Sequence, residues 1–183
     1  TRHDEFELMA ATNAERIKAA HIVEYVLYLW QVEDLVRAAG FDEGTMRSMV
    51  EDQGEDEVRW LLQYAATMQR EGVRKQGHTG AANQALTELA MLHDLLLTTL
   101  KDADYAAAHE AAMPFLKELE GKNAQAGVRA MHPIELVCVT LYGWLVLRMS
   151  KREVSAETEA AMVAVRNLAN ALGAGHRRVY ASN

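Results

Sequence analysis

The chain has 183 residues, half of them hydrophobic, with two prolines, one cysteine and a formal net charge of −7. This length fits one domain and can bury a core without disulfides or a metal. The negative charge argues against general nucleic-acid binding and against an anionic membrane surface, because both attract basic proteins. Frequent Ala, Leu, Glu and Met with almost no proline favour helix throughout.

The single cysteine, Cys138, lies inside the apolar run IELVCVTLYGWLVL. This setting predicts a buried, unreactive thiol, and one cysteine excludes an internal disulfide framework. No signal peptide opens the sequence, although its first residue, Thr1, leaves a removed leader open as an alternative, and the longest uncharged run, 136–147, is shorter than the roughly 20 residues that cross a bilayer. We therefore expect a cytoplasmic protein without a membrane span.

The first long helix is predicted over residues 13–39. Thr12 followed by Glu15 has the spacing of a capping box, and Gly40 is typical of a C-terminal stop. Apolar residues at helical spacing predict further helices over 42–52, 55–71, 81–101, 104–120, 133–150 and 155–172, with a glycine-rich loop at 72–80.

Two of these helices contain a proline. Pro114 should kink or split the fifth helix, because a proline in a helix interior removes a backbone hydrogen bond. His132 is predicted to cap the sixth helix, with Pro133 at the first helical position and Glu135 reaching back to the cap N–H. The sequence thus predicts an all-α fold: one domain over residues 1–183, an antiparallel bundle of six to seven helices, with flexible tails at 1–12 and 174–183.

Two stretches carry a family resemblance: EYVLYLWQVEDLVRAAGFD, which begins at Glu24, and LYGWLVLRMSKREVSAET, which begins at Leu141. LHDLLL and PFLKELEGK lie between them. Together they resemble an uncharacterised bacterial family of small helical proteins, a domain of unknown function. The resemblance covers residues 13–172 and implies an all-α fold, but it implies no activity, cofactor or catalytic residue. The alanine-rich terminal segments depart from the family pattern.

The first helix is apolar on nearly every side, yet Glu24 and Gln31, seven residues apart, fall on one line of it. Because such a helix is usually buried, Glu24 is expected to be at least partly buried and to need a partner. His21 and Tyr28 can reach it within the helix, and His93, in the core register of the fourth helix, can meet it across the bundle. The sequence predicts a buried polar cluster of these five residues.

The predicted cluster has three interpretations: a structural network that fixes helix register, a pocket for a small ligand, and a catalytic acid–base site. Glu33 and Arg37 are assigned to another face of the first helix, as a surface or interface pair. The acidic run 51–57 is interpreted as a solvated turn and helix start. Di-iron and zinc spacings, a phosphate-binding loop and a nucleophile motif are all missing, so no metal or cofactor is predicted.

Two predicted helices are apolar on nearly all faces, which is more apolar surface than a monomer of this size readily covers. We therefore predict a homodimer that acts by non-enzymatic binding, with an unknown small ligand or protein partner and with neither nucleic acid nor membrane. The alternative is a small-molecule-binding protein or enzyme that uses the cluster around Glu24 and His93.

Overall fold

The computed structural model describes residues 11–180, and within this range the regular elements are helical. The all-α fold class predicted from the sequence is confirmed. The chain divides into two compact units, residues 1–85 and 86–183, which are described in turn. Residues 1–10 and 181–183, which belong to the predicted tails, lie outside the described residues.

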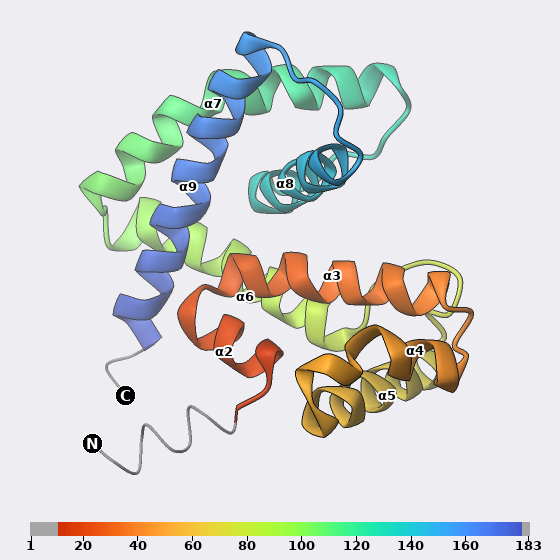
Figure 1. Ribbon diagram of the computed structural model, residues 1–183. Helices are drawn as coiled ribbons and strands as arrows, with labels where there is room; N and C mark the ends of the chain where they lie inside the picture. The colour runs from red at the N-terminus through yellow and green to blue at the C-terminus, as the bar shows by residue number, and fades with distance from the viewer. Residues whose placement is uncertain (1–10, 181–183) are drawn as a thin grey trace. The chain divides into compact units, whose positions relative to one another are not determined.

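The first unit is built around α3, which packs against α2 and α5, while α4 packs on α5 (Figure 1). Val23, Val26 and Leu29 of α3 are completely buried. The unit contains α2 (Asn13–Ala20), α3 (Ile22–Ala38), α4 (Glu43–Val50), a 3₁₀ turn (Glu51–Gln53), α5 (Glu55–Arg70) and the start of α6 (Gly80–Asp94).

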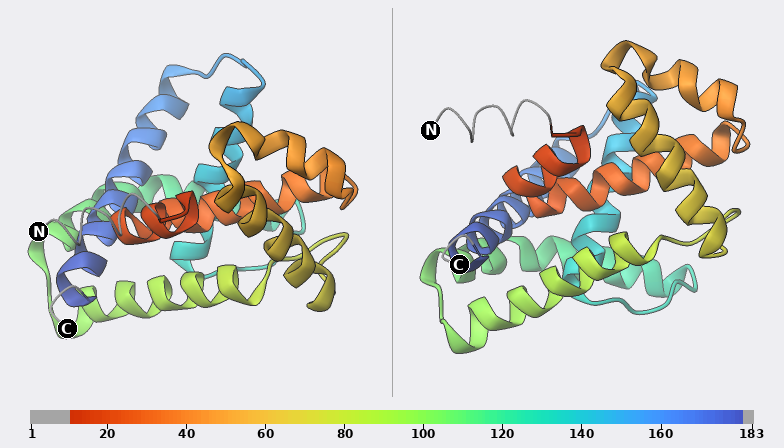
Figure 2. Two further views of the ribbon diagram at one scale, coloured as in Figure 1. Left: turned by 60° about the horizontal axis from the view of Figure 1, so that its bottom comes forward. Right: turned by 90° about the horizontal axis from the view of Figure 1, so that it is seen from below.

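The predicted single helix over 13–39 is wrong, because the chain breaks at His21. The backbone of His21 is extended (φ −160°, ψ 102°). Its N–H closes α2 on the carbonyl of Ile17, and its Nδ1 accepts a weak hydrogen bond from the Glu24 N–H at 3.5 Å. After this break α3 turns back along α2 (Figure 2). The predicted capping box of Thr12 and Glu15 is confirmed.

The second unit contains the rest of α6, a π-helical turn, and α7, α8 and α9, with α7 and α9 side by side (Figure 1). Pro114 does not split α7, but Figure 1 shows the helix changing direction part-way along, as an internal proline predicts. No helix in the described range has both the length and the apolar character that a bilayer crossing needs. The bounds are Leu95–Thr99 for the turn, Ala103–Gln125 for α7, Pro133–Met149 for α8 and Ala156–Tyr180 for α9.

The last helix continues past its predicted end at residue 172 and runs to Tyr180, so the predicted tail from 174 is helical as far as the structure describes it. Gly173 and Gly175 are buried inside this helix rather than ending it. A Cβ atom added to Gly175 would lie 2.7 Å from Cδ1 of Leu96, which is itself 1% exposed. The glycine therefore lets the helix approach its neighbour closely.

The start of α8 partly follows the prediction. Nδ1 of His132 accepts from the Ile134 N–H at 3.1 Å, so His132 is the cap, and Pro133 is the first helical residue. Glu135 does not reach back to the cap but pairs with the guanidinium of Arg129. Cys138 is completely buried, as predicted.

Candidate functional site

A fully buried carboxylate, that of Glu33 on α3, lies at the centre of the first unit. Its Oε1 accepts hydrogen bonds from Tyr64 Oη at 2.9 Å and from the Thr79 N–H at 3.1 Å, and its Oε2 lies 2.7 Å from Nδ1 of His78. The prediction that Glu33 belongs to a surface or interface pair is therefore wrong. Three donors, from α5 and from the loop before α6, surround the carboxylate. Their hydrogen bonds offset much of the free-energy cost of removing its charge from water.

The same network caps the next helix. The Thr79 hydroxyl lies 2.8 Å from Tyr64 Oη and accepts from the Ala82 N–H at 3.3 Å, one of the unpaired donors at the start of α6. The ring of His78 stacks on Trp30 with 4.7 Å between centroids. Glu33 thus joins α3, α5 and the loop that leads into α6.

The charge on Glu33 is stabilised by its partners. Burial alone raises the pKa of Glu33, but the hydrogen bonds from His78, Thr79 and Tyr64 outweigh it and hold the net pKa below its ordinary value. Burial also raises the pKa of Tyr64 far above the usual tyrosine range, so this hydroxyl stays protonated and can donate. The network is a charged carboxylate among hydrogen-bond donors.

Arg37, one turn along α3, holds the other end of the same loop. Its Nη2 donates to the carbonyl of Val73 at 3.0 Å and to that of Gly77, and its Nη1 lies 3.4 Å from Asp34. The predicted loop over 72–80 is confirmed, but the predicted pairing of Arg37 with Glu33 is replaced by bonds from each residue to the loop. Two neighbouring turns of α3 therefore fix this segment from both ends.

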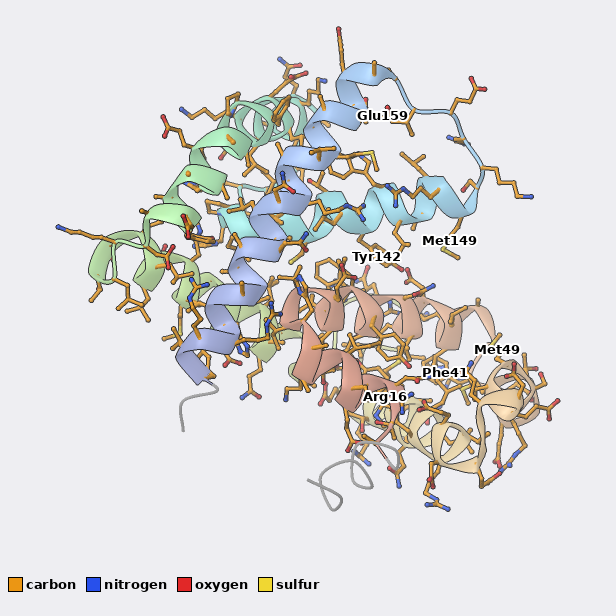
Figure 3. All side chains as sticks on the ribbon, turned by 60° about the vertical axis from the view of Figure 1, so that its left-hand side comes forward. Arg16, Phe41, Met49, Tyr142, Met149 and Glu159 are labelled. Carbon is orange, nitrogen blue, oxygen red and sulfur yellow. The ribbon has the colours of Figure 1, made fainter. Side chains whose placement is uncertain are left out.

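A separate cavity of about 220 Å³ lies in the first unit, lined by residues of α3, α4, the 3₁₀ turn and α5. Most of its wall is aliphatic or methionine, including Met46, which is buried, and Met49, which is 38% exposed and projects from α4 (Figure 3). Its remaining lining is polar or aromatic: Tyr28, Gln31, Gln53, Glu57 and Trp60.

Glu57 is the only acidic or basic residue among the described residues lining this cavity. It is 7% exposed, although the rest of the acidic run from 51 to 56 is exposed as predicted. Its Oε1 accepts from the Asn13 N–H at 2.6 Å at the start of α2. Burial is the largest cause that raises the pKa of Tyr28, and the negative charge of Glu57 is the second. The positive charge of Arg16 lowers this pKa, and the net value is about 12.

The members of the predicted cluster that lie in the first unit have different surroundings. Tyr28 and Gln31 lie together along the cavity, and His21 caps α3. Glu24 is exposed in the first turn of α3, so its expected burial is wrong. His93 is buried in the second unit, and its pairing with Glu24 stays a prediction.

His93 lies in a cluster of its own. Its Nδ1 is 2.5 Å from Tyr105 Oη, and its ring centroid is 5.0 Å from that of His109 and 5.4 Å from that of His132. Burial, with added repulsion from His109 and His132, lowers the pKa of His93 to about 4, although Asp94 acts in the opposite direction. This histidine is therefore neutral at physiological pH, in contrast to the charged Glu33. Among the described residues, no group of histidine, cysteine or acidic side chains has the arrangement that holds a metal ion.

The sequence reasoning missed Glu33 and Glu57. Glu33 follows Val26 by seven residues and Trp30 by three, and both of these are buried, but on a helix that is apolar nearly all round this spacing did not single it out. No local feature of the acidic run 51–57 indicates that Glu57 is buried, because the Asn13 N–H that binds Glu57 comes from a segment 44 positions away.

These observations define an all-α protein with a buried carboxylate network and a small cavity lined by apolar, aromatic and polar side chains. The chain belongs to the family described as Domain of unknown function (DUF4924), which matches over residues 11–181. The predicted resemblance to an uncharacterised helical family is thereby confirmed. No curated protein and no solved structure matches the chain.

Replacing Glu33 with alanine should lower the free energy of unfolding by about 2–4 kcal/mol, because the buried Tyr64 hydroxyl and Thr79 amide lose their acceptor. Glu24→Ala, on the same helix but exposed, should cost about 0.5 kcal/mol or less. Urea unfolding followed by circular dichroism measures both, and amide hydrogen exchange should show faster exchange at Thr79 in Glu33→Ala alone. Equal losses in the two variants would contradict the assigned role of the network.

Stability should fall as the pH drops from about 6.5 to about 4, because the unfolded chain protonates His93 in this range and the folded chain does not. A shift of this size corresponds to roughly 3 kcal/mol over the full range. In His93→Gln, which can still bond Tyr105, the difference in unfolding free energy between pH 7 and pH 4.5 should shrink. His21→Gln removes a histidine outside the group of His93, His109 and His132, and should keep the wild-type difference in unfolding free energy between the two pH values. If His93→Gln also kept this difference in unfolding free energy, the assignment of His93 as buried and neutral in the folded protein would be wrong.

Proposed function

We propose that this protein acts by non-enzymatic binding and that the cavity in the first unit holds a small molecule. The observation that supports the proposal is the cavity itself: an apolar wall with a few polar groups converging on it, which is the usual make-up of a ligand site. Tyr28 and Gln31, two members of the cluster predicted from the sequence, line it.

The size of the cavity limits its occupant. Sites for drug-sized molecules usually measure roughly 300–1,000 Å³, and this cavity measures about 220 Å³. Leu35 and Met49 line it and are 43% and 38% exposed, so they form its rim, and a ligand can enter between them. The ligand we propose is therefore about as large as one ring with a short substituent.

Met49→Trp should block the rim and abolish binding of small aromatic molecules, because the larger side chain occupies the entrance. Met91→Trp is the matched control, since Met91 is 68% exposed and does not line the cavity. Saturation-transfer NMR with a panel of soluble one-ring compounds measures binding to the wild type and to both variants. The proposal fails if no compound binds, or if Met91→Trp loses binding as completely as Met49→Trp.

A homodimer is also part of the proposal. Val139 and Val146, seven residues apart on one face of α8, are 40% and 45% exposed and give this face an apolar surface. Light scattering coupled to size exclusion, at micromolar concentration, should give twice the chain mass, and Val146→Glu should shift the mass towards that of one chain. A monomeric wild type would remove this part of the proposal. The cytoplasmic location stays a prediction from the sequence.

A further inference from the structure

We infer that the cavity takes an organic ammonium ion, with its positive nitrogen held between the Glu57 carboxylate and the rings of Tyr28 and Trp60. This inference rests on the proposed binding function and names the chemical class of the ligand. Three independent features of the first unit support it: an incompletely satisfied carboxylate, two aromatic rings set at an angle, and the charge around the cavity.

The Glu57 carboxylate has room for one more partner. Its Oε1 accepts from the Asn13 N–H at 2.6 Å, whereas Oε2 accepts no hydrogen bond from the described residues and is open to solvent on the cavity side. The residue is 7% exposed and lines the cavity. A carboxylate removed from bulk water attracts a cationic or hydrogen-bond-donating ligand more strongly than an exposed one does. Glu33 offers a useful contrast, because both of its oxygens are already bonded within the protein.

Two aromatic rings lie on the same cavity wall. The centroids of Tyr28 and Trp60 are 5.9 Å apart, with their planes at 36°. Trp60 is supported from behind by Tyr64, whose ring stacks on it at 5.1 Å. Tilted aromatic faces beside a carboxylate are the arrangement by which proteins bind alkylated ammonium groups, because the ring faces carry negative charge density.

The charge around the cavity favours a cation over an anion. Gln53 and Glu57 of the lining belong to the acidic run 51–57, which contains five carboxylates. The nearby positive charges have other partners: Arg47 pairs with Glu55, and Arg16 donates to Asn13 and to the carbonyl of Ala11. A negatively charged ligand would instead meet the buried Glu57 carboxylate, and the nearest cation acting on the cavity, Arg16, is already bonded to Asn13 and Ala11.

The rest of the cavity accepts a hydrocarbon. Met46 and Leu61 are buried on its wall, and methionine adapts its shape to varied apolar groups. Gln31 and Gln53 supply neutral polar groups. The expected ligand is therefore a small amine or alkylated ammonium with one apolar ring or a short chain.

The inference is tested with three probes on the full chain at pH 7.5: benzyltrimethylammonium, the neutral benzyl alcohol and the anionic benzoate. Dissociation constants come from NMR titration of the Met46 and Met49 methyl signals and the Trp60 indole signal. The ammonium probe should bind roughly tenfold more tightly than the alcohol, and benzoate should bind most weakly. Glu57→Gln keeps an acceptor for Asn13 and should remove the advantage of the ammonium without weakening the alcohol. Glu55→Gln, the same change two residues away, should keep it.

The outcomes separate this inference from the proposed function. Equal binding of the alcohol and the ammonium to the wild type would overturn the ammonium assignment and leave a binding cavity in place. Failure of all three probes to shift the cavity signals would overturn the ammonium assignment, and the broader one-ring panel then decides the proposed function separately. The comparison of probes on the wild type requires no variant, so it holds even if Glu57→Gln does not fold.

Discussion

The first unit depends on one buried charge, the carboxylate of Glu33. A charge removed from water costs several kcal/mol unless it is fully bonded, and here three donors from α5 and from the loop before α6 are directed at it. Val32 and Val36, its neighbours on α3, line the cavity, as do Trp60 and Leu61 on α5. The bonds from Glu33 to Tyr64 and to the loop therefore also fix the two helices that form much of the cavity wall.

Much of the helical framework could be predicted from local sequence, because caps, glycine stops and apolar spacing act over a few residues. Local sequence could not decide which glutamate of α3, Glu24 or Glu33, is buried. On a helix that is apolar nearly all round, the pattern alone does not tell which polar residue faces inward. The partners that decide it, Tyr64 and His78, are 31 and 45 residues further along the chain. Tyr28 and Gln31 could be placed side by side from the sequence because they lie three residues apart on the same helix.

The error at the end of the last helix arose because a tertiary contact overrode local preference, whereas the break at His21 is held by local hydrogen bonds. Glycine often ends a helix, yet the missing side chain of Gly175 allows a close approach to Leu96, and the helix continues. His21 has no strong helix-breaking character, yet it ends one helix and caps the next. A glycine is therefore a stop signal only where nothing packs against it.

The buried polar groups of this protein differ in how completely they are bonded within the chain. Glu33 uses both oxygens within the protein, and His93 remains neutral with Tyr105 as its partner, so neither requires a ligand. Glu57 uses one oxygen and lines a cavity with the other unbonded among the described residues. Among the described residues, the only buried side-chain nitrogen or oxygen without a partner is Nε of Arg37, so the second oxygen of Glu57 is reached by solvent. Because that oxygen is accessible and lies beside two aromatic rings, it is the acceptor to which we propose that a ligand brings a donor or a positive charge.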